Sequence, residues 1–423
     1  MSGIFVTSAI TLALISLILG NIVPVYSIGT NAKHGSHISI QNQPNSDIEK
    51  YGLSVNYLSK SYAEQIITSC YDNDDHCPRM ALDDLNKTTG LQTVLGTFSD
   101  LIRLYDENNY SCHHEGHHLG MWLYDYTSNL KEALNHATIL CGGSVYHGIF
   151  QSFFGGEQFV HNTDKNQIVI TQLCPIGQEN VTWLHERDCI HGIGHGLVKL
   201  YNFNTTAAVD RCNEFIPLWT QSACSRGVFM ENIDYFLETG KGNFDKNDIY
   251  YPCNRTVENF APQCYYYYPE YNSERNNFTL GYNLTDIFAQ CDNISPGKFV
   301  KYCYQGIGRM LAPFAYTNPE PSIAACDFGN QTTYHNDCLI GILKTILKSD
   351  ANTDVGVQFC SFSKEDFKAT CYEIVGIWIK TFLYPNKQEL ESECAKAPDV
   401  DYVIKCINAN PKTSLVVPMF EPV

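Results

Sequence analysis

The sequence predicts an all-α protein, an α-solenoid of tandem helical hairpins, most or all of which are stapled by a disulfide. From Cys174 onward, cysteines occur in pairs 11 to 15 residues apart, and the first members of successive pairs lie 34 to 41 residues apart. Capping and turn residues recur at the same place in each period. The 18 cysteines are an even number, as expected when all are paired in an oxidising compartment.

The first 58 residues precede the repeats. Residues 4–20 form an apolar run, and Val25-Tyr26-Ser27 suits cleavage after Ser27, so residues 1–27 are expected to be a signal peptide or, if uncleaved, a membrane anchor. Residues 28–58 are polar and irregular, which predicts a tether. Nine glycosylation sequons agree with export: Asn86, Asn109, Asn180, Asn204, Asn254, Asn277, Asn283, Asn293 and Asn330. We therefore expect a secreted protein or one on the extracytoplasmic cell surface.

Residues 59–203 are expected to form hairpins rich in histidine. Here the bridges depart from the later pattern, since Cys112 has no partner in its own first helix and Cys141 has none in its own second helix. We expect Cys112 and Cys141 to link neighbouring units, and Cys70 and Cys77 to close a first short hairpin.

Residues 204–410 are expected to form the hairpins with regular cysteine pairs, followed by a tail over residues 411–423. The first cysteine lies near the end of one helix and the second near the start of the next, so pairing within each hairpin is the simplest connectivity. The predicted pairs, which begin just upstream of this region, are Cys174 with Cys189, Cys212 with Cys224, Cys253 with Cys264, Cys291 with Cys303, Cys326 with Cys338, Cys360 with Cys371, and Cys394 with Cys406.

A glycine stands three residues after several of the second cysteines, for example at Gly192, Gly227, Gly306 and Gly341. Glycine lowers helix propensity by about 1 kcal/mol relative to Ala. Its recurrence therefore indicates a fixed point where neighbouring helices approach closely.

In unit length, hairpin layout and paired cysteines, residues 60–408 resemble the tetratricopeptide and Sel1-like helical repeat proteins, some of which are exported with a disulfide in each hairpin. The chain lacks the Trp, Gly, Tyr and Pro pattern of a tetratricopeptide consensus, and its glycine register differs from that of Sel1 repeats. The resemblance implies a fold class and no functional residues.

Ten of the 14 histidines lie between His113 and His195. Counted from each cysteine or its equivalent, positions +2 and +6 hold His114 with His118, His147 with Gln151, and His191 with His195. Residues four apart share a helix face, and successive second helices are expected to stack, so these side chains should line one patch. Imidazoles in such pairs suit Zn or Cu, which predicts a transition-metal site at His114, His118, His147, His191 and His195. Structural histidines at a helix seam are the alternative.

His114-Glu115-Gly116-His117-His118 also fits H-E-x-x-H, in which two histidines bind zinc and the glutamate is a general base. Glu115 occupies the position that is Gly148 and Gly192 in later units, so the match is also explained by the repeat. Glu115 is therefore a candidate catalytic residue of a zinc hydrolase.

The function predicted first is an extracytoplasmic binding protein with a histidine-lined metal site. The alternatives are a metal-free scaffold that binds a protein or glycan at the cell envelope, and the zinc hydrolase. A net charge of −17 argues against a nucleic-acid partner, because phosphate neutralisation needs clustered Lys and Arg. Membrane contact is expected only through an uncleaved N-terminal segment. The run Tyr265–Tyr268 is a candidate recognition surface, and Arg226 and Arg309 are candidate anchors for an acidic ligand.

Overall fold

The computed structural model describes residues 55–70, 77–107, 112–156, 167–176, 183–245, 247–275, 284–316, 318–329, 332–350, 353–383 and 386–410. These ranges form 18 helices and no strand, which confirms the all-α prediction. They belong to one compact unit, residues 40–423. The expected signal peptide or anchor and the C-terminal tail lie outside the described residues, whereas α2 begins at Val55, inside the range predicted as a tether. No helix in the described ranges is long and apolar enough to cross a membrane.

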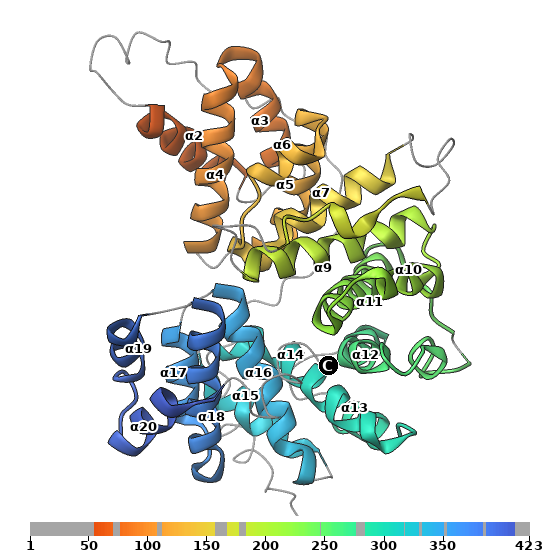
Figure 1. Cartoon of the computed structure of the whole chain (residues 1–423), viewed down its shortest axis with the longest axis vertical. Helices are drawn as coiled ribbons and strands as arrows, with labels where there is room; N and C mark the ends of the chain where they lie inside the picture. The colour runs from red at the N-terminus through yellow and green to blue at the C-terminus, as the bar shows by residue number, and fades with distance from the viewer. Residues whose placement is uncertain are drawn as a thin grey trace, which may run out of the picture. The chain divides into compact units, whose positions relative to one another are not determined.

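Most units consist of a first helix, a turn and a second helix (Figure 1). The first helices are α2 (Val55–Cys70), α4 (Leu91–Glu107), α6 (Leu130–Asn135), α10 (Thr205–Arg211), α13 (Leu284–Asp292), α15 (Pro319–Ala325), α17 (Thr353–Phe362) and α19 (Lys387–Cys394). The second helices are α3 (Cys77–Thr88), α5 (Cys112–Thr127), α7 (Ser144–Gly155), α9 (Trp183–Leu200), α11 (Leu218–Thr239), α12 (Ala261–Arg275), α14 (Val300–Ala315), α16 (His335–Asp350), α18 (Glu365–Trp378) and α20 (Val400–Asn408). Before α9 and α12, the described part of the unit holds a 3-10 turn instead of a first helix, at Ile170–Gln172 and Cys253–Arg255.

The helices begin where the sequence supplies a cap. The Asn204 side chain accepts a hydrogen bond from the backbone N–H of Ala207 at the start of α10. Asn386 and Glu389 form a reciprocal capping box at the start of α19. These caps satisfy N–H groups that a helix cannot pair internally, so the short first helices keep defined starts.

The regular cysteine pairs are confirmed as disulfides, each within its own hairpin. Their Cα atoms lie 5.3 to 5.9 Å apart, the normal distance for a bridge. The bridges join Cys174 to Cys189, Cys212 to Cys224, Cys253 to Cys264, Cys291 to Cys303, Cys326 to Cys338, Cys360 to Cys371, and Cys394 to Cys406. Each short hairpin is thus tied by a covalent link that compensates for a small core.

The bridges of the first units fall outside this regular series. Cys70 and Cys77 are bonded to each other, as predicted. Cys141 is also disulfide-bonded. Its predicted partner is Cys112, whose side chain lies outside the described residues, so the link between neighbouring units stays a prediction.

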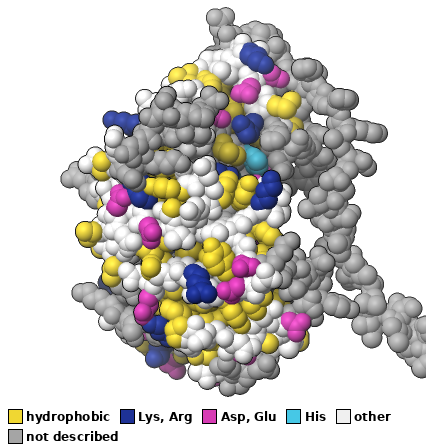
Figure 2. All heavy atoms as spheres, turned by 90° about the vertical axis from the view of Figure 1, so that its right-hand side faces the viewer, with side chains coloured by type: hydrophobic (Ala, Val, Ile, Leu, Met, Phe, Trp, Pro, Cys, Tyr) yellow, Lys and Arg dark blue, Asp and Glu magenta, His cyan; other side chains and the backbone are white. Residues whose placement is uncertain are grey.

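Successive second helices from α5 to α16 pack side by side, and the core follows this row. Phe150, Ile193, Val228, Ile307 and Ile342 are all fully buried along it. On the face seen in Figure 2, acidic and basic side chains are interspersed, and among its coloured residues histidine forms only one small patch. Four histidines, His117, His147, His191 and His195, are buried in the interior.

The predicted close approach at the recurring glycines is present. A Cβ on Gly227 would lie 2.0 Å from the carbonyl oxygen of His191, and a Cβ on Gly341 would lie 2.0 Å from that of Gln305. The same positions meet in both pairs. The glycine lies three residues after the second cysteine of its own unit, and the carbonyl lies two residues after the second cysteine of the preceding unit. This backbone contact sets the register in which side chains of neighbouring second helices face one another.

The register differs for α5. By the rule of the later units, Gly148 of α7 should meet the carbonyl of His114, but it lies against that of His117, where a Cβ would be 1.9 Å away. The approach has moved by three residues, or one helical turn. Cys112 is not part of the regular ladder, so counting from it misplaces the residues of α5.

Candidate metal centre

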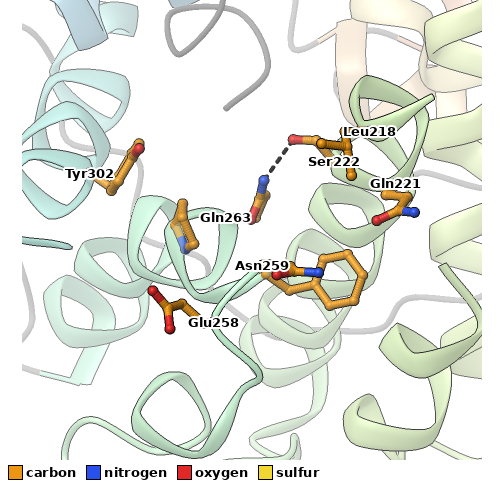
Figure 3. A pocket seen from close by; sticks show the side chains of 9 residues that line it. Leu218, Gln221, Ser222, Glu258, Asn259, Gln263 and Tyr302 are labelled. Atoms are coloured by element: carbon orange, nitrogen blue, oxygen red, sulfur yellow. Dashed lines mark hydrogen bonds between the residues drawn. The ribbon is translucent and has the colours of Figure 1, made fainter. Parts of the chain in front are cut away.

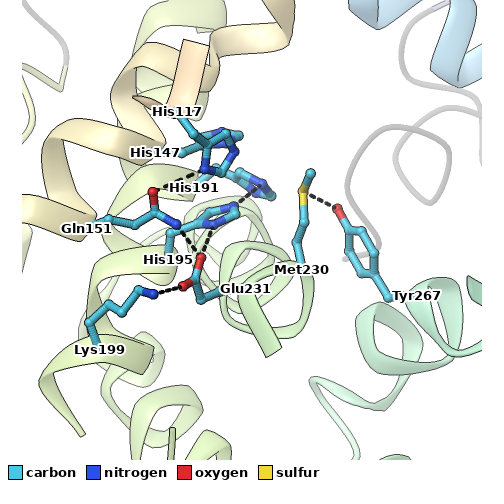
Figure 4. Close-up of polar contacts among 9 residues, drawn as sticks. All are labelled: His117, His147, Gln151, His191, His195, Lys199, Met230, Glu231 and Tyr267. Carbon is cyan, nitrogen blue, oxygen red and sulfur yellow. Dashed lines mark hydrogen bonds and ion pairs between the residues drawn. The ribbon is translucent and has the colours of Figure 1, made fainter. Parts of the chain in front are cut away.

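Five histidines from three successive second helices meet in the interior. His113 and His117 come from α5, His147 from α7, and His191 and His195 from α9; we call them the histidine cluster. His147, His191 and His195 are 0 % exposed and His117 is 8 % exposed. Figure 4 shows four of these rings together, with Glu231 of α11 beside them.

The cluster contains three groups of residues that each offer ligand atoms within 4.8 Å of one another. They are His113 with His117 and His147, His147 with His191 and His195, and His117 with His195 and Asp234. Nε2 of His191 lies 3.4 Å from Nε2 of His195, and Nδ1 of His147 lies 3.0 Å from Nε2 of His117. Two nitrogens bound tetrahedrally at about 2.0–2.1 Å from one zinc ion lie about 3.4 Å apart, close to both distances.

Outward hydrogen bonds fix the tautomers of four rings. Nδ1 of His113 lies 2.9 Å from the carbonyl oxygen of Cys141, and Nδ1 of His191 lies 3.1 Å from that of Ala223. A carbonyl oxygen only accepts, so each of these Nδ1 atoms carries the proton. The Nε2 atom of each ring then has its lone pair free to bind a metal.

The other two rings are fixed through a carboxylate (Figure 4). Nδ1 of His195 donates to Oε2 of Glu231 at 2.9 Å. The same oxygen accepts from Nε2 of Gln151, so the Gln151 carbonyl oxygen is left to accept from Nδ1 of His117 at 3.1 Å. His117 and His195 therefore also keep their protons on Nδ1. Metal-binding histidines are commonly held in this way by a second layer of acceptors.

Burial favours the neutral, metal-binding form of these rings. Desolvation lowers the pKa of His113 to about 3 and the pKa values of His117, His147 and His191 well below their usual range. The pKa of His195 is also lowered by desolvation, partly offset by its hydrogen bond to Glu231. Two lone pairs face each other at 3.4 Å between His191 and His195, and a bound cation would turn this repulsion into attraction.

Two carboxylates of α11 supply negative charge. Burial raises the pKa of Glu231, but the hydrogen bond from His195 and the charge of Lys199 outweigh it, so the net pKa is lowered and Glu231 stays ionised. Lys199 Nζ lies 2.9 Å from Oε1 of Glu231. Burial and then the charge of Glu231 raise the pKa of Asp234 to about 8. A bound cation would lower the pKa of Asp234 again, because a nearby positive charge favours the ionised carboxylate.

The structure brings together three of the five residues predicted as ligands, His147, His191 and His195. His114 and His118 lie elsewhere: their Nε2 atoms are 3.1 Å apart, and among the described residues neither belongs to a three-residue group. The one-turn shift of α5 is the reason, since it turns His113 and His117 toward α7 instead. The spacing of four residues between His113 and His117 was the sequence signal that could have identified this pair as ligands. No comparable signal in the sequence marks Glu231 or Asp234 as part of the site.

Glu115 lies on α5 between His114 and His118 and is partly buried. It belongs to none of the three groups found in the described residues. The three residues that define H-E-x-x-H, His114, Glu115 and His118, therefore lie outside the histidine cluster, although His117 within the same string belongs to it.

The other predicted recognition residues are largely interior. Tyr265–Tyr268 are 1 to 6 % exposed, so the run packs in the core instead of forming a surface. Arg226 is buried over the ring of Tyr266, and Arg309 forms an ion pair with Glu270.

A cavity of about 250 Å³ opens near α11 and α12 (Figure 3). Its lining is mixed, with amides, a hydroxyl, a carboxylate and aromatic rings, and Gln263 is hydrogen-bonded to Ser222 within it. No cluster histidine lines this cavity or the smaller one that adjoins it.

The described residues are thus all-helical and contain buried histidines that could hold a metal ion. Their many disulfides point to an oxidising compartment. Comparisons with protein families, with curated proteins and with solved structures each find no match to this chain.

Proposed function

We propose that the protein binds a transition-metal ion at the histidine cluster, outside the cytoplasm. The observation that carries the proposal is the orientation of the rings. Four Nδ1 protons point outward to fixed acceptors, so four Nε2 lone pairs remain for a metal in a water-poor interior. Histidines that serve only a helix seam need no such shared orientation.

The donor set favours Zn or Cu. Imidazole nitrogen suits both metals, and the Asp234 carboxylate adds a harder ligand near His117 and His195. The cysteines of the regular ladder are disulfide-bonded, so they offer no thiolate to compete for the ion. Burial of the cluster supports retention of a metal instead of turnover of a substrate, since substrate ligands usually enter through an open cavity.

Metal content and metal-dependent stability test the proposal. Protein purified with its disulfides intact should contain stoichiometric metal by elemental analysis, and chelation should lower its melting temperature. Re-addition of zinc at about 100 times its Kd should restore about 2.7 kcal/mol of stability. Absence of stoichiometric metal, with melting unchanged on adding zinc or copper, contradicts the proposal.

Matched substitutions locate the site. His195→Gln should weaken metal binding at the histidine cluster, whereas His118→Gln, on the neighbouring face of α5, should leave it unchanged. Glu115→Gln should also retain the metal. If Glu115→Gln instead removes a hydrolytic activity while metal is kept, the zinc hydrolase becomes the better account.

The cavity near α11 and α12 supports a second candidate, a scaffold that binds a glycan or protein without metal. Its polar lining includes Gln221, Asn259 and Tyr302, side chains that suit hydroxyl-rich ligands. A glycan array probed with metal-stripped protein should give binding that Asn259→Ala weakens. Folded protein that binds no glycan on the array, or binding that Asn259→Ala leaves unchanged, argues against this candidate.

A further inference from the structure

His147 occupies a special place in the histidine cluster. Of the five histidines, it alone belongs to both of the groups that contain only histidines. Its ring centroid lies 5.1 Å from that of His113, 4.8 Å from those of His117 and His191, and 4.2 Å from that of His195. It is the hub around which the two pairs of outer histidines are arranged.

Its two nitrogens are also used differently from those of the other rings. In each of the four outer histidines, Nδ1 donates a hydrogen bond to an acceptor outside the cluster. Nδ1 of His147 instead points to another ligand atom, Nε2 of His117, at 3.0 Å. Nε2 of His147 is buried and has no hydrogen-bond partner among the described residues. One nitrogen of this ring therefore faces another ligand atom, and the other is buried without a partner beside the rings of His191 and His195.

A buried imidazole nitrogen without a partner is costly, because it has lost water and gained nothing in return. A metal ion on Nδ1 and a second on Nε2 would satisfy both nitrogens of His147. The remaining donors divide into two pairs in the same way, His113 with His117 on one side and His191 with His195 on the other.

We propose that the cluster holds two metal ions bridged by the imidazole of His147. This rests on the proposed metal-binding function and specifies its form. One ion is bound by His113, His117 and His147, and the other by His147, His191 and His195. When the second ion binds, the ring proton of His147 leaves to solvent and the ring becomes a bridging anion.

The surroundings supply further negative charge for two cations. Asp234 has a carboxylate oxygen within 4.8 Å of ligand atoms of His117 and His195, one histidine from each pair. Glu231 is 1 % exposed and receives the Nδ1–H of His195, so its charge reaches the second ion through that ring. Together with the bridging ring, these carboxylates reduce the repulsion between the ions.

Metal stoichiometry and magnetic coupling test the bridge. The full chain is stripped of metal, titrated with Zn²⁺ or Cu²⁺, separated from excess ion and analysed for metal per chain. Two ions per chain are expected. With Cu²⁺, the second equivalent should diminish the electron paramagnetic resonance signal instead of doubling it, because imidazolate couples two copper spins antiferromagnetically.

A matched pair of variants identifies the bridging ring. His147→Gln should fold, since Gln305 occupies the same register position in a later unit, and it should bind one ion with a full-intensity copper signal. His118→Gln should keep two coupled ions. If His147→Gln does not fold, the copper titration of the natural chain decides alone. One ion with full signal intensity, or a His147→Gln variant that keeps two ions, overturns the bridge and leaves metal binding intact. No bound ion overturns both.

Discussion

Replacing Glu231 by Gln tests whether the outer layer of acceptors controls the metal. Oε2 of Glu231 accepts hydrogen bonds from His195 and Gln151, and Oε1 lies 2.9 Å from Lys199 Nζ. A glutamine has one oxygen and one NH2 group at these positions, so it cannot accept from all three donors. Turning the NH2 group toward Lys199 loses the fewest bonds, because Lys199 is partly exposed and can reach water.

The size of the effect follows from these contacts. Loss of one charge-assisted hydrogen bond should lower the free energy of unfolding of the metal-free protein by about 1.5–3 kcal/mol. Removal of the carboxylate behind His195 should weaken metal binding about 10- to 100-fold, which corresponds to about 1.4–2.7 kcal/mol. Competition titration against a chelator measures the Kd, and urea unfolding measures the stability.

Glu238→Gln is the control, because Glu238 lies on the same helix and is exposed. It should change neither quantity by more than about 0.5 kcal/mol. A Glu231→Gln variant that folds and binds zinc with the Kd of the natural chain refutes the assignment of Glu231 as the support of His195.

Three further perturbations have defined outcomes. Gly227→Ala places a Cβ 2.0 Å from the carbonyl oxygen of His191 and should destabilise the fold by about 3 kcal/mol in urea unfolding, whereas Gly297→Ala, with open space around it, should have little effect. Replacing Cys326 and Cys338 by Ser removes a bridge between residues 12 apart and should lower stability by about 2–4 kcal/mol; an unchanged urea midpoint would show that the staple is dispensable. The metal-free protein should lose stability as the pH falls from about 6.5, the pKa of an unfolded histidine, toward the folded value of about 3 for His113, because only the unfolded chain then takes up the proton. Equal urea midpoints at pH 7.5 and pH 5 would contradict that reasoning.

The fold was predictable because its main constraint is periodic. Cysteine pairs mark the turn of each hairpin, and the glycine three residues later marks the contact with the neighbouring helix. Both signals are local in sequence, so they can be recognised without knowledge of the tertiary structure. His147, His191 and His195 were identified because positions +2 and +6, counted from the cysteine or its equivalent, share one face of each helix.

The rest of the site depends on contacts that the period does not encode. Cys112 is not part of the regular ladder, so the register in α5 shifts by one turn and His113 and His117 replace His114 and His118. Glu231 and Asp234 lie on a fourth helix that carries no histidine pair, and only the stacking of α11 on α9 brings them to the cluster. A sequence pattern reports which residues share a face of one helix. It does not report which neighbouring face they meet.

The meeting of His117 and His195, whose ring centroids are 5.2 Å apart, has a consequence for how the chain unfolds. In a repeat array each unit contacts chiefly its neighbours, so units can open one after another from an end. These two rings belong to α5 and α9, which are separated by α7. The two ions proposed for the cluster, joined through His147 of α7, would clamp three hairpins at once and make α5, α7 and α9 unfold as a single cooperative block. The repeats from α17 onward, which lack the clamp, would remain free to open singly.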